Sequence, residues 1–175
     1  MLIFVEGTHD EHFLKCYLEY LNIKDVKIKY TNGKDGLGDY KKDIVKNNNV
    51  KIIFDADNDL EEAKENIKEQ LGEELFNKCE IFLIPNNKDN GNLEILIENI
   101  VKEECVLKCF DCYVECLKKL KENNKNIKLP AKKSKVYAYN HSFGYKNGDK
   151  NYTIDNRYFN LESKYLNPLK EFLSQ

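Results

Sequence analysis

Three short apolar runs have the length and composition of β-strands that are buried on both faces. They cover residues 2–5, 50–54 and 81–84. A fourth segment, residues 26–30, alternates apolar residues with lysines, which is the pattern of a strand with one exposed face. The chain therefore predicts four strands in its first half.

Helical patterns separate these strands, over residues 8–21, 39–46 and 60–71. Thr8 and Glu11 have the spacing of a capping box at the start of the first helix, and Gly72 closes the third. Strands that alternate with helices favour a parallel sheet covered on both faces. We expect an α/β, Rossmann-like fold with a parallel sheet of about four strands.

The second half of the chain is mostly helical by pattern. Helices are predicted over residues 92–101, 103–122 and 130–139, with a short last helix starting at Asn167-Pro168. No repeat or linker divides the 175 residues, and this length suits one domain. We expect a single domain, residues 1–175, with a core over about 1–100 and a helical C-terminal extension over about 101–175.

Composition narrows the possible partners. The formal net charge of -2 and the pI near 6.0 argue against nucleic-acid binding through bulk electrostatics, so a phosphate partner would need a local metal or basic patch. No basic leader precedes the first acid, and no apolar stretch reaches the roughly 20 residues of a membrane span. We therefore expect a cytoplasmic protein with reduced cysteines and no membrane partner.

Acidic residues follow two of the buried strands. Glu6 comes directly after the first strand and Asp55 after the third, while Asp10 lies in the first turn of the next helix and Asp57 in the following loop. Ligands of open parallel sheets bind beyond the carboxyl ends of the strands. If the first and third strands are neighbours, these carboxylates can share a hard cation, and oxygen ligands suit Mg²⁺ or Mn²⁺.

Other interpretations of the segment DADND are weaker. An EF-hand loop needs glycine at its sixth position and glutamate at its twelfth, where this chain has Leu60 and Asn66. Haloacid-dehalogenase phosphatases also place DxD after a buried strand, but usually follow it with threonine or valine where this chain has Asn58. An alternative is that these aspartates, Asp55, Asp57 and Asp59, only cap the loop and the next helix. The presence of Glu6 at the end of another buried strand makes this alternative less favourable.

Taken together, FVEGTHD and IIFDADND resemble the Toprim domain shared by topoisomerases, bacterial primases and overcoming-lysogenization-defect (OLD) nucleases. That family has a glutamate after its first strand and a DxD after its third, which Glu6, Asp55 and Asp57 match. The spacing from Glu6 to Asp10 is closer to the OLD nucleases, and Glu94 in GNLE resembles their later acid at a second metal position. Most of the chain is similar to small stand-alone Toprim-like proteins of unassigned function.

The chain also departs from these relatives. Toprim topoisomerases and primases commonly have a glycine soon after DxD, and none follows Asp57 here. No room is left for a tyrosine-bearing topoisomerase domain. Gly33, Gly36 and Gly38 lack the GK[ST] ending of a Walker loop, so any ATP would come from another protein.

The resemblance implies divalent-metal-dependent phosphodiester hydrolysis of DNA or RNA. It implies Mg²⁺ or Mn²⁺ held by Glu6, Asp10, Asp55, Asp57 and Glu94, with catalysis by Glu6 and a late lysine, for which Lys133 and Lys135 are candidates. The alternative for Lys133 and Lys135 is that they lie on a lysine-rich helix face that is simply exposed to solvent. Two other functions stay open: a structured-RNA processing enzyme like the small Toprim ribosomal-RNA maturase, and a regulatory subunit that docks on an ATPase partner.

Four cysteines in the second half recur at intervals of four, three and four residues: Cys105, Cys109, Cys112 and Cys116. This spacing places them along one face of a single helix, where they cannot surround one ion tetrahedrally. We expect small core residues, together with Val106 and Tyr113. His9 and His12 lie near the acidic residues in sequence, either as contacts of a phosphate or metal or as solvated first-turn residues.

Overall fold

Four parallel strands form the centre of the molecule. The structure, a computed structural model, describes residues 1–145 and 154–175. The strands are β1 (Leu2–Val5), β2 (Lys27–Tyr30), β3 (Val50–Asp55) and β4 (Glu80–Ile84), in the order β2-β1-β3-β4. All three pairings are parallel, and β1 lies between β2 and β3. The predicted α/β, Rossmann-like parallel sheet of four strands is confirmed, and the first and third strands are neighbours.

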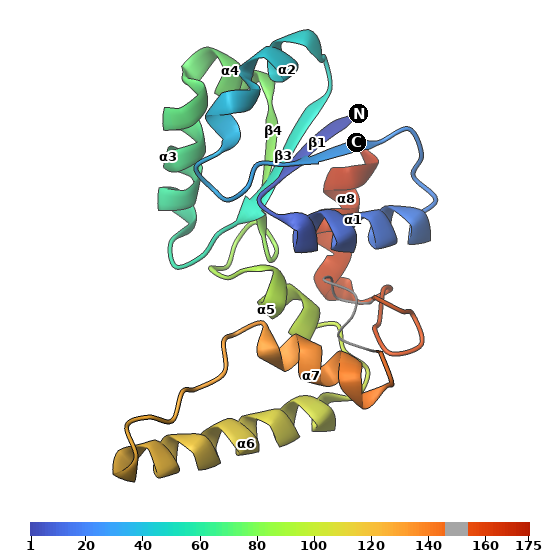
Figure 1. The fold of residues 1–175 in the computed structure, drawn as a ribbon. Helices are drawn as coiled ribbons and strands as arrows, with labels where there is room; N and C mark the ends of the chain where they lie inside the picture. The colour runs from blue at the N-terminus through green and yellow to red at the C-terminus, as the bar shows by residue number, and fades with distance from the viewer. Residues whose placement is uncertain (146–153) are drawn as a thin grey trace.

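Helices cover both faces of this sheet (Figure 1). One face carries α1 (Thr8–Tyr20) and α8 (Asn167–Ser174), while the other carries α2 (Lys41–Lys46), α3 (Leu60–Leu71) and α4 (Glu73–Lys78). A 3-10 helix, η1 (Leu37–Tyr40), leads into α2. The sheet is thus the middle of three layers, as expected for strands whose residues are buried on both sides.

Two separate apolar clusters occupy the two faces, because successive strand residues point to opposite sides. Ile3 and Val5 of β1 belong to the cluster with α1 and α8, whereas Leu2 and Phe4 belong to the cluster with α2 and α3. All four side chains are at most 3% exposed. The continuous apolar run in the sequence therefore reflects a strand that serves both cores.

A fully buried lysine joins the sheet to the C-terminal helix. The Lys51 ammonium group in β3 donates to the Glu80 carboxylate and to the Phe172 carbonyl oxygen, each at 2.7 Å, and lies 4.4 Å from the centre of the Phe172 ring. These partners compensate the desolvated charge. Lys51 thus holds α8 against β3 and β4.

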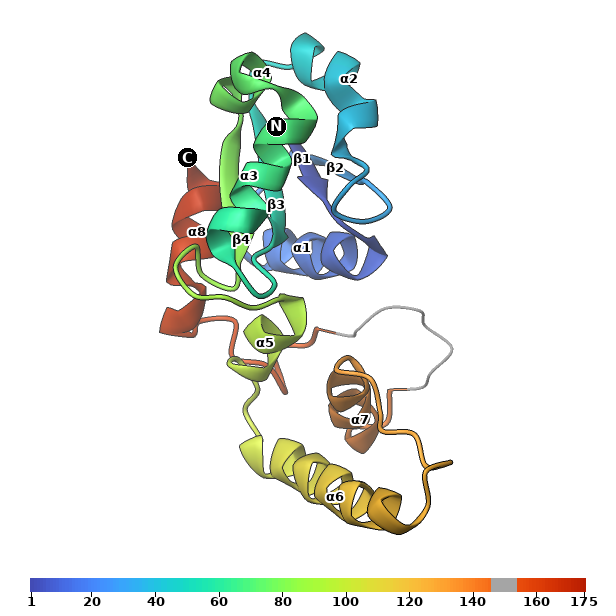
Figure 2. The same ribbon diagram turned by 90° about the vertical axis from the view of Figure 1, so that its left-hand side faces the viewer.

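The C-terminal part is mostly helical, as predicted. It contains α5 (Leu93–Glu98), α6 (Glu104–Asn123), α7 (Ser134–Ser142), the 3-10 helix η2 (Lys164–Leu166) and α8. Figures 1 and 2 show α5 next to the end of the sheet, α7 beyond it, and α6 farthest from the strands. Packing of α6 on α7 and of α7 on α5 links this part to the core. Within the described residues, no helix is both long enough and apolar enough to span a bilayer.

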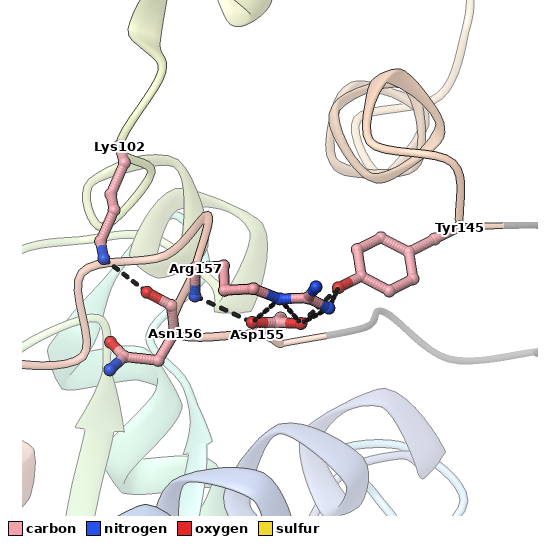
Figure 3. Close-up of polar contacts among 5 residues, drawn as sticks. All are labelled: Lys102, Tyr145, Asp155, Asn156 and Arg157. Carbon is pink, nitrogen blue, oxygen red and sulfur yellow. Dashed lines mark hydrogen bonds and ion pairs between the residues drawn. The ribbon is translucent and has the colours of Figure 1, made fainter.

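A polar cluster ties the segment after residue 153 to the end of α7 (Figure 3). The Arg157 guanidinium donates to both carboxylate oxygens of Asp155, and the Tyr145 hydroxyl donates to the same carboxylate. Arg157, followed by Tyr145, holds the pKa of Asp155 below its usual range. The Lys102 ammonium group donates to the Asn156 carbonyl oxygen beside it. This cluster fixes the path of the chain that leads to η2 and α8.

The predicted capping box at Thr8 and Glu11 is wrong. The helix is capped at Gly7, whose N–H donates to the Asp10 carboxylate at 2.9 Å, and Glu11 instead pairs with Lys15. The extended backbone of Gly7 places its N–H over the first turn, where the third helical residue and not the fourth reaches it. Asp10 is thereby held at the start of α1.

Two helix predictions also need correction. The short helix α4 lies between Gly72 and β4, in a stretch that the sequence analysis left without structure. The seventh helix begins at Ser134 and not at Pro130, although proline is favoured at the first position of a helix. The predicted strands and the remaining helices agree with the structure to within a few residues.

The prediction that the four cysteines of α6 are core residues is wrong as well. Cys105, Cys109, Cys112 and Cys116 are all exposed, and Tyr113 is 53% exposed. The apolar side of α6 that packs on the protein is centred on Leu107, on the opposite side of the helix. The spacing of the cysteines correctly indicated that they share one face of the helix, but it did not indicate whether the protein covers that face.

Candidate functional site

Glu6 and Asp55 lie at the carboxyl edge of the sheet, at the ends of two neighbouring strands. Glu6 follows β1 directly, and Asp55 is the last residue of β3. The backbone N–H of Asp55 donates to Oε1 of Glu6 at 2.9 Å, which holds the Glu6 side chain across the gap between the strands. The parallel register of β1 and β3 therefore brings together two acids that are far apart in the sequence.

Asp10 joins this edge from the first turn of α1. Its side chain is 9% exposed, and one carboxylate oxygen accepts the N–H of Gly7, the residue after Glu6. The turn from β1 into α1 therefore places Glu6 and Asp10 beside the same strand end.

The loop after β3 is connected to the start of α5 by backbone contacts. The Asp57 N–H donates to the Gly91 carbonyl oxygen at 2.7 Å, and the Leu93 N–H donates to the Asp55 carboxylate at 3.0 Å. Gly91 has φ 152°, and an added Cβ would lie 3.1 Å from Pro85 and Ile95 side-chain atoms. Glycine at this position thus permits the backbone before α5 to pass close to Pro85 and Ile95.

Burial and mutual repulsion raise the pKa of the central carboxyls. Burial raises the pKa of Glu6 to about 7 and that of Asp10 to about 6. The pKa of Asp55 is raised well above its usual value, first by burial and then by the charges of Asp10, Glu6, Glu94 and Asp57. Glu94 on α5 also raises the pKa of Asp10. The five acids singled out in the sequence therefore share one electrostatic environment.

The acids at this edge can be compared with the known requirements of a metal site. Among the described residues, no group of three or more His, Cys, Asp or Glu side chains has the geometry of a ready metal site. The donors are nevertheless all carboxylate oxygens, the ligand type that Mg²⁺ and Mn²⁺ prefer. Mg²⁺ commonly binds through one or two carboxylates and completes its shell with water and substrate phosphates. The donor set fits such an open site and not a closed protein cage.

Two hollows adjoin the acids. A cleft of about 120 Å³ between the loop after β3 and α3 is lined by Glu6, Asp55, Asp57 and Lys34, among others. A wider cleft of about 420 Å³ lies on the α1 side of Glu6 and Asp55, bordered by Asp10 and Tyr30. Glu6 and Asp55 line both hollows, so a ligand in either one meets the same two carboxylates.

Lys34 is a site residue that the sequence analysis missed. Its ammonium group lies 3.8 Å from the Asp57 carboxylate, and both side chains are about half exposed. It comes from the loop between β2 and η1, which lies opposite the loop after β3. The signal in the sequence was weak, since Lys34 is one lysine of many and only the folded loop brings it to the acids.

The two late lysines that the sequence singled out lie in different surroundings. Lys135 is 18% exposed and pairs with Glu98 and Asp111, at 3.0 and 2.9 Å. Lys133 is exposed and lies one helical turn before Tyr137, whose hydroxyl contacts Nε2 of His9 at 2.6 Å. Burial and then the charge of Glu94 raise the pKa of Tyr137, so this tyrosine of α7 lies near the acidic edge. Lys133 itself lies at the exposed start of α7.

The remaining predicted residues have local partners. Asp59 accepts the N–H groups of Glu61 and Glu62 and caps α3, as the capping alternative expects, whereas Asp55 accepts the N–H of Leu93 at the start of α5. The His12 ring contacts the Cys16 thiol at 3.7 Å, away from the acids.

The comparison with protein families gives a match over the whole chain. A family model described as a protein of unknown function, DUF3226, matches residues 1–175. The chain belongs to the DUF3226 family. No curated protein and no solved structure gives a significant match. For this DUF3226 member, the site geometry is therefore the main guide to function.

Proposed function

We propose that this DUF3226 protein hydrolyses phosphodiester bonds in nucleic acid with the help of a divalent cation bound at the acidic edge. The main support is the Glu6–Asp55 arrangement, in which two strand ends present partly buried carboxylates with raised pKa values to a common cleft. Buried like charges are costly unless a cation compensates them, and clustered raised pKa values are typical of functional sites. The Toprim-like order of Glu6, Asp55 and Asp57 along the chain supports the same proposal.

In this proposal Glu6, Asp55 and Asp10 hold the cation, and Glu94 and Asp57 border it. When bound, the cation supplies charge compensation for the phosphate and acidity for a nearby water. The raised pKa values mean that part of the site is protonated near neutral pH before the cation binds. Glu6 must lose this proton when the cation binds, so as a ligand it is present as the carboxylate.

Lysines on two sides of the site would contact the phosphate backbone. Lys34 borders the cleft that contains Asp57, and Lys133 lies at the exposed start of α7, one helical turn before the tyrosine that contacts His9 of α1. Phosphate contacts of this kind fix a nucleic acid in register without selecting its sequence. With a formal net charge of -2, the protein depends on such local contacts for its affinity.

The test is a cleavage assay with plasmid DNA, single-stranded DNA and a structured RNA, each with Mg²⁺ or Mn²⁺. The variants Glu6→Gln and Asp55→Asn remove charge at nearly constant shape. Asp59→Asn serves as a matched control, because Asp59 follows the same strand but caps α3. We expect the first two variants to lose at least about a hundredfold in rate and the control to keep near-full activity.

Each alternative function gives its own result in this assay. Cleavage of RNA alone would identify a structured-RNA processing enzyme. Cation binding without cleavage of any substrate would favour a regulatory subunit. Cleavage that survives both Glu6→Gln and Asp55→Asn would contradict the proposed site.

A further inference from the structure

Helix α6 has one side that the described part of the protein leaves uncovered. Figures 1 and 2 show α6 at the end of the molecule farthest from the sheet, with α7 along one side of it. Leu107 on that side is buried. The opposite side presents Cys105, Cys109, Cys112 and Cys116, all exposed, and next to them Tyr113 and Leu120 at 53% and 57% exposure.

The cysteines follow the spacing of a coiled-coil seam. Intervals of four, three and four residues are those of the a and d positions of a heptad, with Cys109 and Cys116 at a and Cys105 and Cys112 at d. Thiols are small and apolar, so a seam of cysteines allows close helix packing. We call these four residues the thiol seam.

We propose that the thiol seam of α6 is the interface with a second copy of this chain, with the two α6 helices antiparallel. In an antiparallel pair each a residue packs on a d residue of the other helix. Cys109 then lies opposite Cys112 of the second copy, and Cys105 lies opposite Cys116. This register gives four seam layers related by one two-fold axis, which is the symmetry most homodimers use.

The charges beside the seam favour this occupant and this direction. The g positions are Lys108 and Glu115, and the e positions are Val106 and Tyr113. In the antiparallel register Lys108 meets Glu115 of the second copy twice, while Val106 meets Tyr113. In a parallel pair, each g residue would instead face an e residue, so Lys108 would meet Tyr113 and both charges would lack partners. Of the two directions for a homodimer, the antiparallel one therefore pairs both the charged and the apolar residues beside the seam.

The intrachain partners of these charges do not prevent the pairing. Lys108 lies 3.6 Å from Glu104, and Glu115 lies 2.6 Å from Lys118, with all four side chains more than half exposed. Exposed pairs of this kind contribute little and rearrange readily. Because four seam layers make a short interface, we expect a reversible dimer with a dissociation constant on the order of 10 µM.

The test uses charge reversal on the full-length protein, with sedimentation velocity over a wide range of concentration. Lys108→Glu places two like-charged pairs across the seam, and Glu115→Lys does the same with opposite sign. Each variant alone is expected to dimerise at least about tenfold more weakly than the wild type. An equimolar mixture of the two variants restores both opposite-charge pairs and is expected to dimerise again.

Lys64→Glu on the exposed surface of α3 is the control for a general charge effect. It is expected to leave the dimer unchanged, and circular dichroism checks that all variants keep their fold. A wild type that stays monomeric at every concentration would overturn the proposal. The proposal would also be overturned if neither charge reversal changed the dissociation constant of the dimer. The same holds if the two variants stayed monomeric when mixed. None of these outcomes depends on nuclease activity.

Discussion

The backbone N–H of Asp55 donates a 2.9 Å hydrogen bond to the Glu6 carboxylate and joins the ends of β3 and β1. This contact keeps the Glu6 carboxylate beside that of Asp55. Burial raises the pKa of both groups, although the Asp55 N–H partly lowers that of Glu6. The charges of Asp10 and Asp57 raise the pKa of both carboxyls further. The apo site is therefore destabilising at neutral pH, and a cation would relieve it.

The Glu6→Gln variant should be more stable than the wild type when a chelator removes divalent cations. The pKa of Glu6 rises from 4.5 to about 7 on folding, so the folded protein binds more protons than the unfolded chain between these values. Wild-type stability should fall as the pH rises through this window. The variant lacks the titrating group and should gain about 1–2 kcal/mol at about pH 8, with no gain at about pH 4.

Urea unfolding at the two pH values measures this difference. Glu62→Gln is the matched control, because Glu62 lines the same cleft from the exposed side of α3. A Glu6→Gln variant that is less stable than the wild type at the higher pH would show that the Glu6 charge is already well compensated.

Cation binding should strengthen with pH and release protons. Because Glu6 has a pKa of about 7 and Asp10 of about 6, the cation must displace protons from these carboxyls below neutral pH. We expect Mn²⁺ affinity to rise by about tenfold or more between about pH 5.5 and about pH 7.5. Calorimetry in buffers of different ionisation enthalpy measures the protons released, and an affinity independent of pH would argue against these ligands.

Gly91→Ala should weaken the link between β3 and α5. At φ 152° an alanine is strained, and its Cβ would approach Pro85 and Ile95 within 3.1 Å. We expect a loss of about 1–3 kcal/mol in the free energy of unfolding and weaker cation binding, because Gly91 accepts the Asp57 N–H. Gly33→Ala is the control, since Gly33 also has positive φ but no atom near the added Cβ. Equal losses in both variants would trace the effect to φ alone.

Lys135→Ala and Lys133→Ala should separate stability from activity. Lys135 pairs with Glu98 and Asp111 and is mostly buried, so its loss should cost about 1–2 kcal/mol of stability. Lys133 is exposed at the start of α7 and is a proposed phosphate contact, so its loss should leave stability unchanged and lower cleavage severalfold. Thermal unfolding and cleavage rates test both expectations, and a reversed pattern would show that Lys135 acts at the site.

The sheet was predictable because its signal is local. The residues of β1, β3 and β4 form apolar runs, and their alternation with helices determines a parallel arrangement. Glu6 and Asp55 could be placed together from sequence because parallel strands end at a common edge. The short helix α4 was missed because six residues carry too little periodicity to stand out.

Features that depend on distant contacts could not be predicted in the same way. The exposure of Cys109 and Cys112 depends on where α7 packs, since a periodic pattern marks a face without stating what covers it. Lys34 reaches Asp57 only through the fold of the loop after β2. Asp10 caps α1 in place of Glu11 because of the backbone of Gly7, which the sequence pattern does not specify.

Titration calorimetry with Mn²⁺ and Mg²⁺ is the most direct test of the acidic site. Wild type, Asp55→Asn and Asp59→Asn are compared at about pH 7.5, where the central carboxyls can lose their protons. Asp55 is central to the cluster, whereas Asp59 lies at the rim of the cleft and caps α3. The account predicts binding by the wild type and Asp59→Asn, and a loss of at least about tenfold in affinity for Asp55→Asn. Equal binding by all three proteins, or no binding by the wild type, would contradict it.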